Sequence, residues 1–163
     1  MTKSIDNFSI MNKTYTGKMT IGSTTPSYDL ETKPNLNHPL DHIDEKLILK
    51  TVEKFLGKTL QQPPIFSAVK KDGVRSYKLA RQGKEIKLDK REVTIEEFKI
   101  TDIKFPEVSF SVTCSKGTYI RSLVHDFGKE LNSGAHLSEL RRTKIGDFSV
   151  ENSEKVMDFV RSI

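Results

Sequence analysis

The sequence predicts an α+β domain built on a mostly antiparallel sheet with flanking helices. Two observations support this class. Stretches in which apolar residues alternate outnumber stretches with helical periodicity, and short turns, not regular strand–helix–strand crossovers, join them. The chain has 163 residues, of which 35% are apolar and 30% charged, as is typical of one globular domain. We therefore treat residues 1–163 as one unit.

The first half of the chain predicts one strand and two helices. A strand is expected at 13–21, where one face carries Tyr15, Gly17, Met19 and Ile21. Residues 22–40 are rich in polar residues and proline and predict a long surface excursion. Asp44 is placed to cap a helix that Gly57 ends and whose apolar face is Ile48, Val52, Phe55 and Leu56. Pro63-Pro64 predicts an extended run, and a turn at 70–73 precedes a helix over 76–82.

The second half predicts two long strands before a helix. Residues 93–100 and 108–114 alternate as strands, and helical periodicity over 118–131 follows, with Thr118 placed as its cap. A short helix is expected at 138–142 and a strand at 145–150. A last helix is expected from Ser153, and its buried face would hold Val156, Phe159 and Val160.

Composition excludes several classes of function. The four histidines show no metal-ligand spacing with one another or with Cys114, so no metal site is expected. No apolar run is long enough to span a bilayer, and the first residues contain no apolar signal region. A single cysteine cannot form an internal disulfide, which fits a cytoplasmic location. The net charge of +5 is compatible with a polyanionic partner.

The most informative segment is Ser115-Lys116-Gly117-Thr118-Tyr119-Ile120-Arg121. It predicts a strand-to-helix corner from which Tyr119 can stack on an extruded base and Arg121 can bind a carboxylate or phosphate. Locally the same pattern also fits an ordinary capped helix with a core tyrosine.

Four other segments are candidates for the same site: the strand with Tyr15, a hydroxyl-rich loop ending in Asp29, a basic and aromatic stretch with Lys70 and Lys71, and the patch Leu140-Arg141-Arg142-Thr143. Each has a structural alternative, since Tyr15 fits a core position and Asp29 can cap a turn.

In order and spacing these segments resemble the TruB family of tRNA pseudouridine synthases. The matching stretches are 13–15, 22–29, 63–73, 77–83, 114–121, 133–137 and 140–143. The resemblance implies the pseudouridine synthase catalytic-domain fold and isomerisation of the tRNA T-loop uridine, without cofactor or metal. The base would be flipped out, its glycosidic bond broken with the help of an aspartate, and the base rejoined through carbon-5. The implied partner is the T-stem-loop of tRNA, bound by a monomer.

The resemblance also implies a role for each candidate residue. Tyr15 would stack on the flipped base, Tyr119 would form a second wall, and Arg121 would pair with the catalytic aspartate. The substrate-binding residues would be Asp29 at the pocket mouth, Leu140 as an apolar wall, Arg142 beside it, and Lys70 and Lys71 in an RNA-gripping insertion over residues 63–84.

One departure from the family is expected to matter. The family's nucleophile lies in a Gly-x-x-Gly-x-Leu-Asp-Pro-type loop before the Lys13 strand, and no segment of this sequence has that pattern. We therefore expect an incomplete copy, inactive alone, in which Arg121 faces an empty position and the first strands of the sheet are missing. The alternative is a non-catalytic RNA-binding protein.

Overall fold

The structure is a computed structural model that describes residues 5–34, 36–71, 73–83, 88–154 and 160–161. Its elements, in chain order, are α1 (Ile5–Ile10), β1 (Lys13–Ile21), β2 (Ser23–Thr24), β3 (Leu36–Asn37), α2 (Glu45–Glu53), β4 (Gly57–Gln61), β5 (Lys70–Lys71), β6 (Val74–Arg75), α3 (Ser76–Arg81), β7 (Arg91–Lys104), β8 (Glu107–Cys114), α4 (Ile120–Glu130), β9 (Ala135–Ile145), β10 (Phe148–Ser149) and the 3₁₀ turn η2 (Val150–Asn152).

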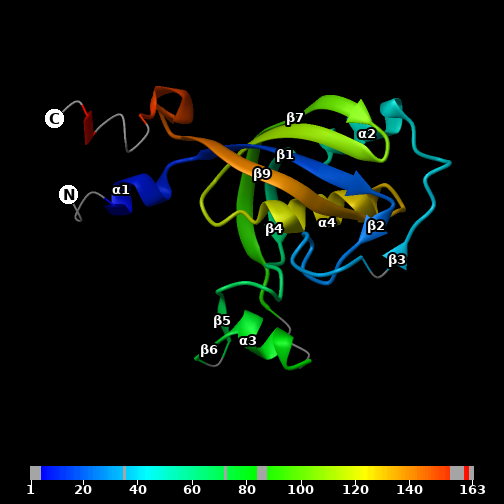
Figure 1. Ribbon diagram of the computed structural model, residues 1–163, viewed down its shortest axis with the longest axis horizontal. Coiled ribbons are helices and arrows are strands. Elements are labelled where there is room, and N and C mark those ends of the chain that lie inside the picture. Colours follow the sequence, from blue (N-terminus) through cyan, green and yellow to red (C-terminus); the bar gives the residue numbers. More distant parts are fainter. Residues whose placement is uncertain (1–4, 35, 72, 84–87, 155–159, 162–163) are drawn as a thin grey trace.

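Six strands form one sheet in the order β10-β9-β1-β8-β7-β4, and all its neighbouring strands run antiparallel (Figure 1). This confirms the predicted α+β class. In the middle of the sheet, β1 places Tyr15 opposite Val112 of β8 and Arg142 of β9. Residues opposite each other in an antiparallel pair share a face of the sheet, so these three residues point to the same side.

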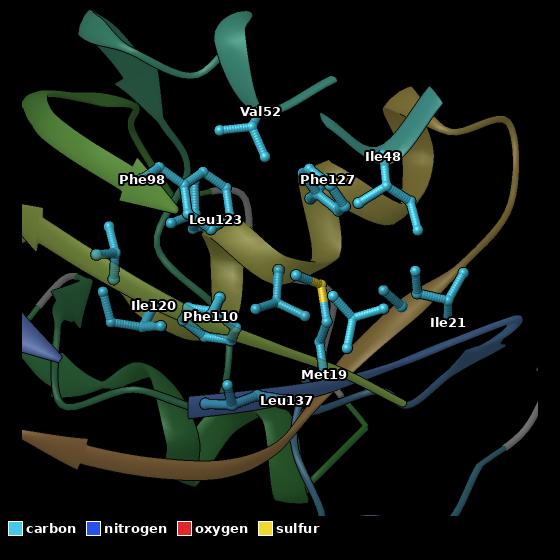
Figure 2. Packing of buried hydrophobic residues seen from close by; sticks show 14 of the residues in the cluster. Met19, Ile21, Ile48, Val52, Phe98, Phe110, Ile120, Leu123, Phe127 and Leu137 are labelled. Carbon is cyan, nitrogen blue, oxygen red and sulfur yellow. The ribbon is translucent and has the colours of Figure 1, made fainter. Parts of the chain in front are cut away.

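The core lies between that face of the sheet and two helices, α4 and α2 (Figure 2). Alternate residues of β8 are buried because its inner face meets α4, as the sequence pattern predicted. Met19, Phe110 and Phe127 are fully buried at the centre. This packing fixes the position of α4 over the sheet, and with it the residues at the start of α4.

Two parts of the chain extend from this core (Figure 1). The hairpin β5–β6 and helix α3 project together from the body, at the position of the predicted insertion. Elsewhere, α1 lies beside β10, where the rings of Phe8 and Phe148 meet edge to face with centroids 5.3 Å apart.

The largest error of the sequence prediction concerns residues 138–142, which were expected to be helical and instead lie within strand β9. A bulge explains the misleading pattern. On β9, Leu137 lies opposite Met19 and Glu139 lies opposite Lys18, so Ser138 is an extra residue between them. Because of the bulge, Leu137 and Leu140 lie on the same face of the strand although they are three positions apart in the sequence. That spacing mimics one face of a helix.

Other differences are smaller. The Asp44 cap is confirmed, since its carboxylate accepts the Leu47 N–H at 2.7 Å, but Leu56 is 46% exposed. Strand β4 and helix α1 were not predicted. The strand expected at 145–150 is only the two residues of β10, because β9 runs on to Ile145. Of the helix expected from Ser153, Ser153 and Glu154 are not helical, whereas residues 160–161 are. Val160 is 60% exposed, and Val156 and Phe159 lie outside the described residues.

Candidate nucleotide site at the start of helix α4

The corner predicted at Ser115–Arg121 is present between β8 and α4. Gly117 makes the turn with a φ of 80°, a conformation that glycine adopts without strain. Ser115 fastens the corner to β7, because its N–H donates to the Thr94 carbonyl and its hydroxyl accepts the Thr94 N–H, both at 2.9 Å. The predicted cap is wrong: the Thr118 hydroxyl donates back to the Ser115 carbonyl at 2.9 Å, and Tyr119 occupies the N-cap position.

Three oxygen atoms accept hydrogen bonds from Arg121 and fix the orientation of its guanidinium group. Its Nη1 donates to Asp29 Oδ2 at 2.9 Å and to the Ser27 carbonyl at 3.5 Å, and its Nη2 donates to the Phe66 carbonyl at 3.1 Å. The side chains of Arg121 and Asp29 are 22% and 24% exposed. Arg121 therefore has a carboxylate partner in Asp29, whereas the expected vacancy concerns the family's nucleophilic aspartate, which these contacts do not test.

The loop that carries Asp29 is stabilised by its own hydroxyl groups. The Thr25 and Ser27 hydroxyls both donate to the Asp29 carbonyl, at 2.7 and 3.2 Å. The second carboxylate oxygen of Asp29, Oδ1, accepts the Glu31 N–H at 2.9 Å. Both structural readings of this loop thus hold, since it satisfies its own backbone and Asp29 caps a turn. The same contacts aim the remaining carboxylate oxygen at Arg121.

Tyr15 and Arg142 meet across the β1–β9 ladder on the inner face of the sheet. Burial raises the pKa of the Tyr15 hydroxyl above its ordinary value of 10.0, and the neighbouring Arg142 opposes that rise. Tyr15 packs against the edge of the core, as its structural alternative expected, yet it is only half-buried. It therefore combines a packed ring with an accessible side.

Tyr119 and Leu140 complete the set of candidate pocket residues. The Arg91 guanidinium lies 5.8 Å from the centre of the Tyr119 ring, close enough for a cation–π contact. Leu140 is 45% exposed and lies opposite Gly17, two residues along β1 from Tyr15. A cavity of about 400 Å³ brings Leu140 together with Arg121 and Asp29; its other lining residues are Leu30, Glu31, Leu137, Ser138 and Glu139.

Besides the Phe66 carbonyl that accepts from Arg121, the predicted insertion contacts this site through an ion pair. Arg81 of α3 donates to Glu31 at 2.9 Å, next to the loop that carries Asp29. Lys70 is exposed on β5, followed by Lys71 on the same strand. The insertion thus carries basic residues while one of its arginines is tied to the mouth of the cavity.

A second cluster lies beside the Asp29 loop. The rings of Tyr28 and His125 stack with centroids 3.7 Å apart. Burial lowers the pKa of His125 from 6.5 to about 4, with smaller contributions from Lys129 and His38. Within the described residues, no group of three or more His, Cys, Asp or Glu side chains could hold a metal ion, and no helix is long and apolar enough to cross a membrane.

Comparisons with known proteins agree on one family. A model of the N-terminal domain of the TruB family pseudouridylate synthases matches residues 1–120, and a model of the tRNA pseudouridylate synthase B C-terminal domain matches residues 121–161. Over 162 residues the chain is 56% identical to tRNA pseudouridine synthase B of Flavobacterium johnsoniae. The aligned region covers 99% of this chain and 71% of that protein. The protein of the same name from Phocaeicola vulgatus is 42% identical, and the aligned region covers 97% of this chain and 67% of that protein.

Solved structures show the same fold. A chain of a Cbf5–Nop10–Gar1 complex matches with a TM-score of 0.66 and 28% identity. The match covers 94% of this chain and 37% of that chain. An H/ACA RNP bound to a substrate RNA containing 2′-deoxyuridine matches with a TM-score of 0.66 at 24% identity, covering 98% of this chain and 37% of that chain.

Proposed function

Because the chain belongs to the TruB family of tRNA pseudouridine synthases, we propose that its site serves the conversion of the T-loop uridine of tRNA to pseudouridine. The observation that carries the proposal is the Arg121–Asp29 ion pair, at 2.9 Å, on the wall of a 400 Å³ cavity that Leu140 also lines. An oriented guanidinium beside an apolar wall suits a reaction in which a carboxylate must stay ionised next to a base.

The reaction moves one bond and one proton. The glycosidic bond between C1′ and N1 of the uridine breaks, the base turns, and a new bond forms between C1′ and carbon-5. The proton on carbon-5 is then lost and N1 gains a proton, so the product is an isomer of the substrate. We propose that Tyr15 stacks on the flipped base, that Tyr119 forms the second wall, and that Leu140 excludes water from the ring.

Tyr15 has a further proposed part in the proton step. Its raised pKa keeps the hydroxyl protonated before the substrate binds. The hydroxyl must therefore first lose its own proton, which passes through water to N1 of the base. The resulting phenolate, stabilised by a nearby cation, then accepts the carbon-5 proton. Arg142, opposite Tyr15 on β9, is that cation in our proposal.

The aspartate that the family uses as nucleophile has no match among the 163 residues. We infer that turnover requires this aspartate, delivered to Arg121 on the family's Gly-x-x-Gly-x-Leu-Asp-Pro-type loop, and that the 163 residues alone do not isomerise uridine. In this reading Asp29 orients Arg121 for the second carboxylate.

We propose the T-stem-loop of tRNA as the partner, bound by a cytoplasmic monomer. The net charge of +5 and the exposed Lys70 support binding of a phosphate backbone. One of the similar solved structures is described as bound to a substrate RNA. For this chain the proposed contacts are Lys70 and Lys71 on the insertion and Arg142 beside the pocket.

A chimera tests the proposal directly. The part of the Flavobacterium johnsoniae protein that contains the aspartate loop is joined to this chain, and the product is incubated with a T-stem-loop RNA that carries tritium at carbon-5 of the target uridine. We expect release of tritium by the chimera and none by the chain alone or by a chimera whose loop aspartate is changed to asparagine. RNA binding without tritium release by the intact chimera would overturn the proposal in favour of a non-catalytic RNA-binding protein.

A further inference from the structure

The side chain of Gln61, at the end of β4, makes two hydrogen bonds to the backbone of Tyr119, the residue proposed above as the second wall of the base pocket. Its Oε1 accepts the Tyr119 N–H at 2.8 Å, and its Nε2 donates to the Tyr119 carbonyl at 3.1 Å. Gln61 is 4% exposed, so water competes little for these bonds. We propose that Gln61 is a positioning residue that fixes Tyr119 in the base pocket, an inference that rests on the proposed function.

The two bonds constrain the backbone on both sides of the Tyr119 side chain. Tyr119 has an extended conformation, with a φ of −96° and a ψ of 108°, and no side chain caps the helix that begins after it. Neighbouring strands pair through one N–H and one carbonyl of the same residue, and the Gln61 amide reproduces this pairing. It therefore restricts rotation of the two peptides that flank Tyr119.

The segment that follows Gln61 holds the next residues of α4. The Ser122 hydroxyl donates to the Gln62 carbonyl at 2.8 Å, and Arg121 donates to the Phe66 carbonyl at 3.1 Å. Pro63 and Pro64 between these carbonyls are buried and have restricted backbone angles. Residues 61–66 thus run alongside the start of α4 and hold Tyr119, Arg121 and Ser122 through hydrogen bonds. Gln61 makes the first of these contacts along the segment.

The neutral glutamine amide supplies both the donor and the acceptor that these bonds need, without a change of protonation. An ionised glutamate at position 61 accepts from the Tyr119 N–H but brings a carboxylate against the Tyr119 carbonyl. A methionine fills a similar volume and makes neither bond. Both changes leave the apolar contacts of the site nearly intact, so they separate the hydrogen bonds from packing. The expected order of Tyr119 constraint is glutamine, then glutamate, then methionine.

Amide hydrogen exchange tests this inference on the chain itself. In a ¹⁵N-labelled sample, Gln61→Met should speed exchange of the Tyr119 N–H by about tenfold or more while the Leu123 N–H, which donates to the Tyr119 carbonyl, changes less. Gln61→Glu should give an intermediate rate. The matched control is Ser133→Ala, which removes a buried hydroxyl that donates to the Pro39 carbonyl at 3.0 Å beyond the other end of α4. Equal Tyr119 exchange in Gln61→Met and Ser133→Ala overturns the inference.

The kcat and KM of the chimera distinguish positioning of Tyr119 from a purely structural role, because a structural role alone would not change kcat relative to KM. Misplacement of a pocket wall should lower kcat on the T-stem-loop by about tenfold with a change in KM of about twofold or less, because orientation affects the reacting geometry more than RNA binding. Ser133→Ala should leave kcat unchanged. Unchanged kcat in Gln61→Met also overturns the inference. A chimera that is inactive with Gln61 in place refutes the proposed function instead, and the exchange experiment still decides whether Gln61 holds Tyr119.

Discussion

The Arg121–Asp29 ion pair gives the sharpest quantitative prediction. We consider Asp29→Asn, Arg121→Met and the double variant, each compared with the unaltered chain by urea denaturation. Asp29→Asn keeps the size of the side chain and removes its charge. Arg121→Met removes the charge and, in addition, leaves the carbonyls of Ser27 and Phe66 without their Arg121 donor. Arg121→Met should therefore cost more stability than Asp29→Asn.

The geometry sets the size of the coupling between the two charges. Opposite unit charges about 4 Å apart attract by roughly 4 kcal/mol at an effective dielectric constant near 20. The two side chains are about a quarter exposed, with Nη1 and Oδ2 at 2.9 Å, so solvent reduces this value without removing it. Fully exposed pairs contribute about 0.2–1 kcal/mol, and we expect a coupling free energy of about 1–2 kcal/mol here.

The control is the Lys58–Glu92 pair, which joins β4 and β7 at 3.5 Å with side chains 75% and 63% exposed. A cycle of Lys58→Met and Glu92→Gln should give a coupling near zero, because water screens both charges. All seven proteins, with the unaltered chain shared by the two cycles, need two-state unfolding with similar urea dependence for the comparison to hold. A coupling below about 0.5 kcal/mol for Arg121 and Asp29, within the usual scatter of additivity, would refute the ion pair as an organising contact of the site.

Three further predictions concern the sheet, the pH dependence and the RNA. Gly17→Ala should lower the free energy of unfolding by about 1–3 kcal/mol in urea, because the new Cβ would lie 2.6 Å from the Glu139 carbonyl oxygen and 2.9 Å from Phe110. Stability should fall as the pH decreases from 6.5 to about 4, since the unfolded chain binds a proton at His125 that the folded chain does not, and His125→Phe should show a smaller fall. Lys70→Ala should weaken T-stem-loop binding and lower the slope of log K against log salt by about 1 in a fluorescence anisotropy titration, whereas Lys50→Ala, exposed on α2, should not.

Local patterns predicted the parts of the fold that local interactions determine. The alternation in β1 and β8 reflects one buried face, and the Asp44 cap is a contact within one helical turn, so both are visible in the sequence. The start of α4 was mispredicted because Thr118 is a good capping residue by type, yet its hydroxyl turns back to Ser115. The bulge at Ser138 could not be read either, since the register of β9 against β1 decides it.

In the candidate site, too, the sequence predicted which residues take part but not the contacts between residues that are far apart in the chain. Tyr15, Tyr119, Arg121, Asp29 and Leu140 were identified through the family resemblance, but the sequence could not pair Arg121 with Asp29, which lies 92 positions away. Gln61 was missed altogether. Its partner is 58 positions along the chain, and a glutamine at the end of a short strand carries no pattern that marks it as buried. The pair Gln61-Gln62 before Pro63-Pro64 is the one local hint, since the prolines cannot donate backbone hydrogen bonds there, but the pattern does not tell which of the two glutamines is buried.

Asp29 and a second carboxylate can both be served by Arg121, and the donor count explains how. A guanidinium has five N–H groups, and the described partners of Arg121 are one carboxylate oxygen and two carbonyls. Two N–H groups therefore have no partner among the described residues. Because Asp29, Ser27 and Phe66 already fix the plane of the guanidinium, a second carboxylate would meet a cation that needs no reorientation. In the proposed reaction, such preorganisation would lower the free energy needed to stabilise charge in the transition state, and this is the role that the proposal gives to Asp29, which takes no part in bond making.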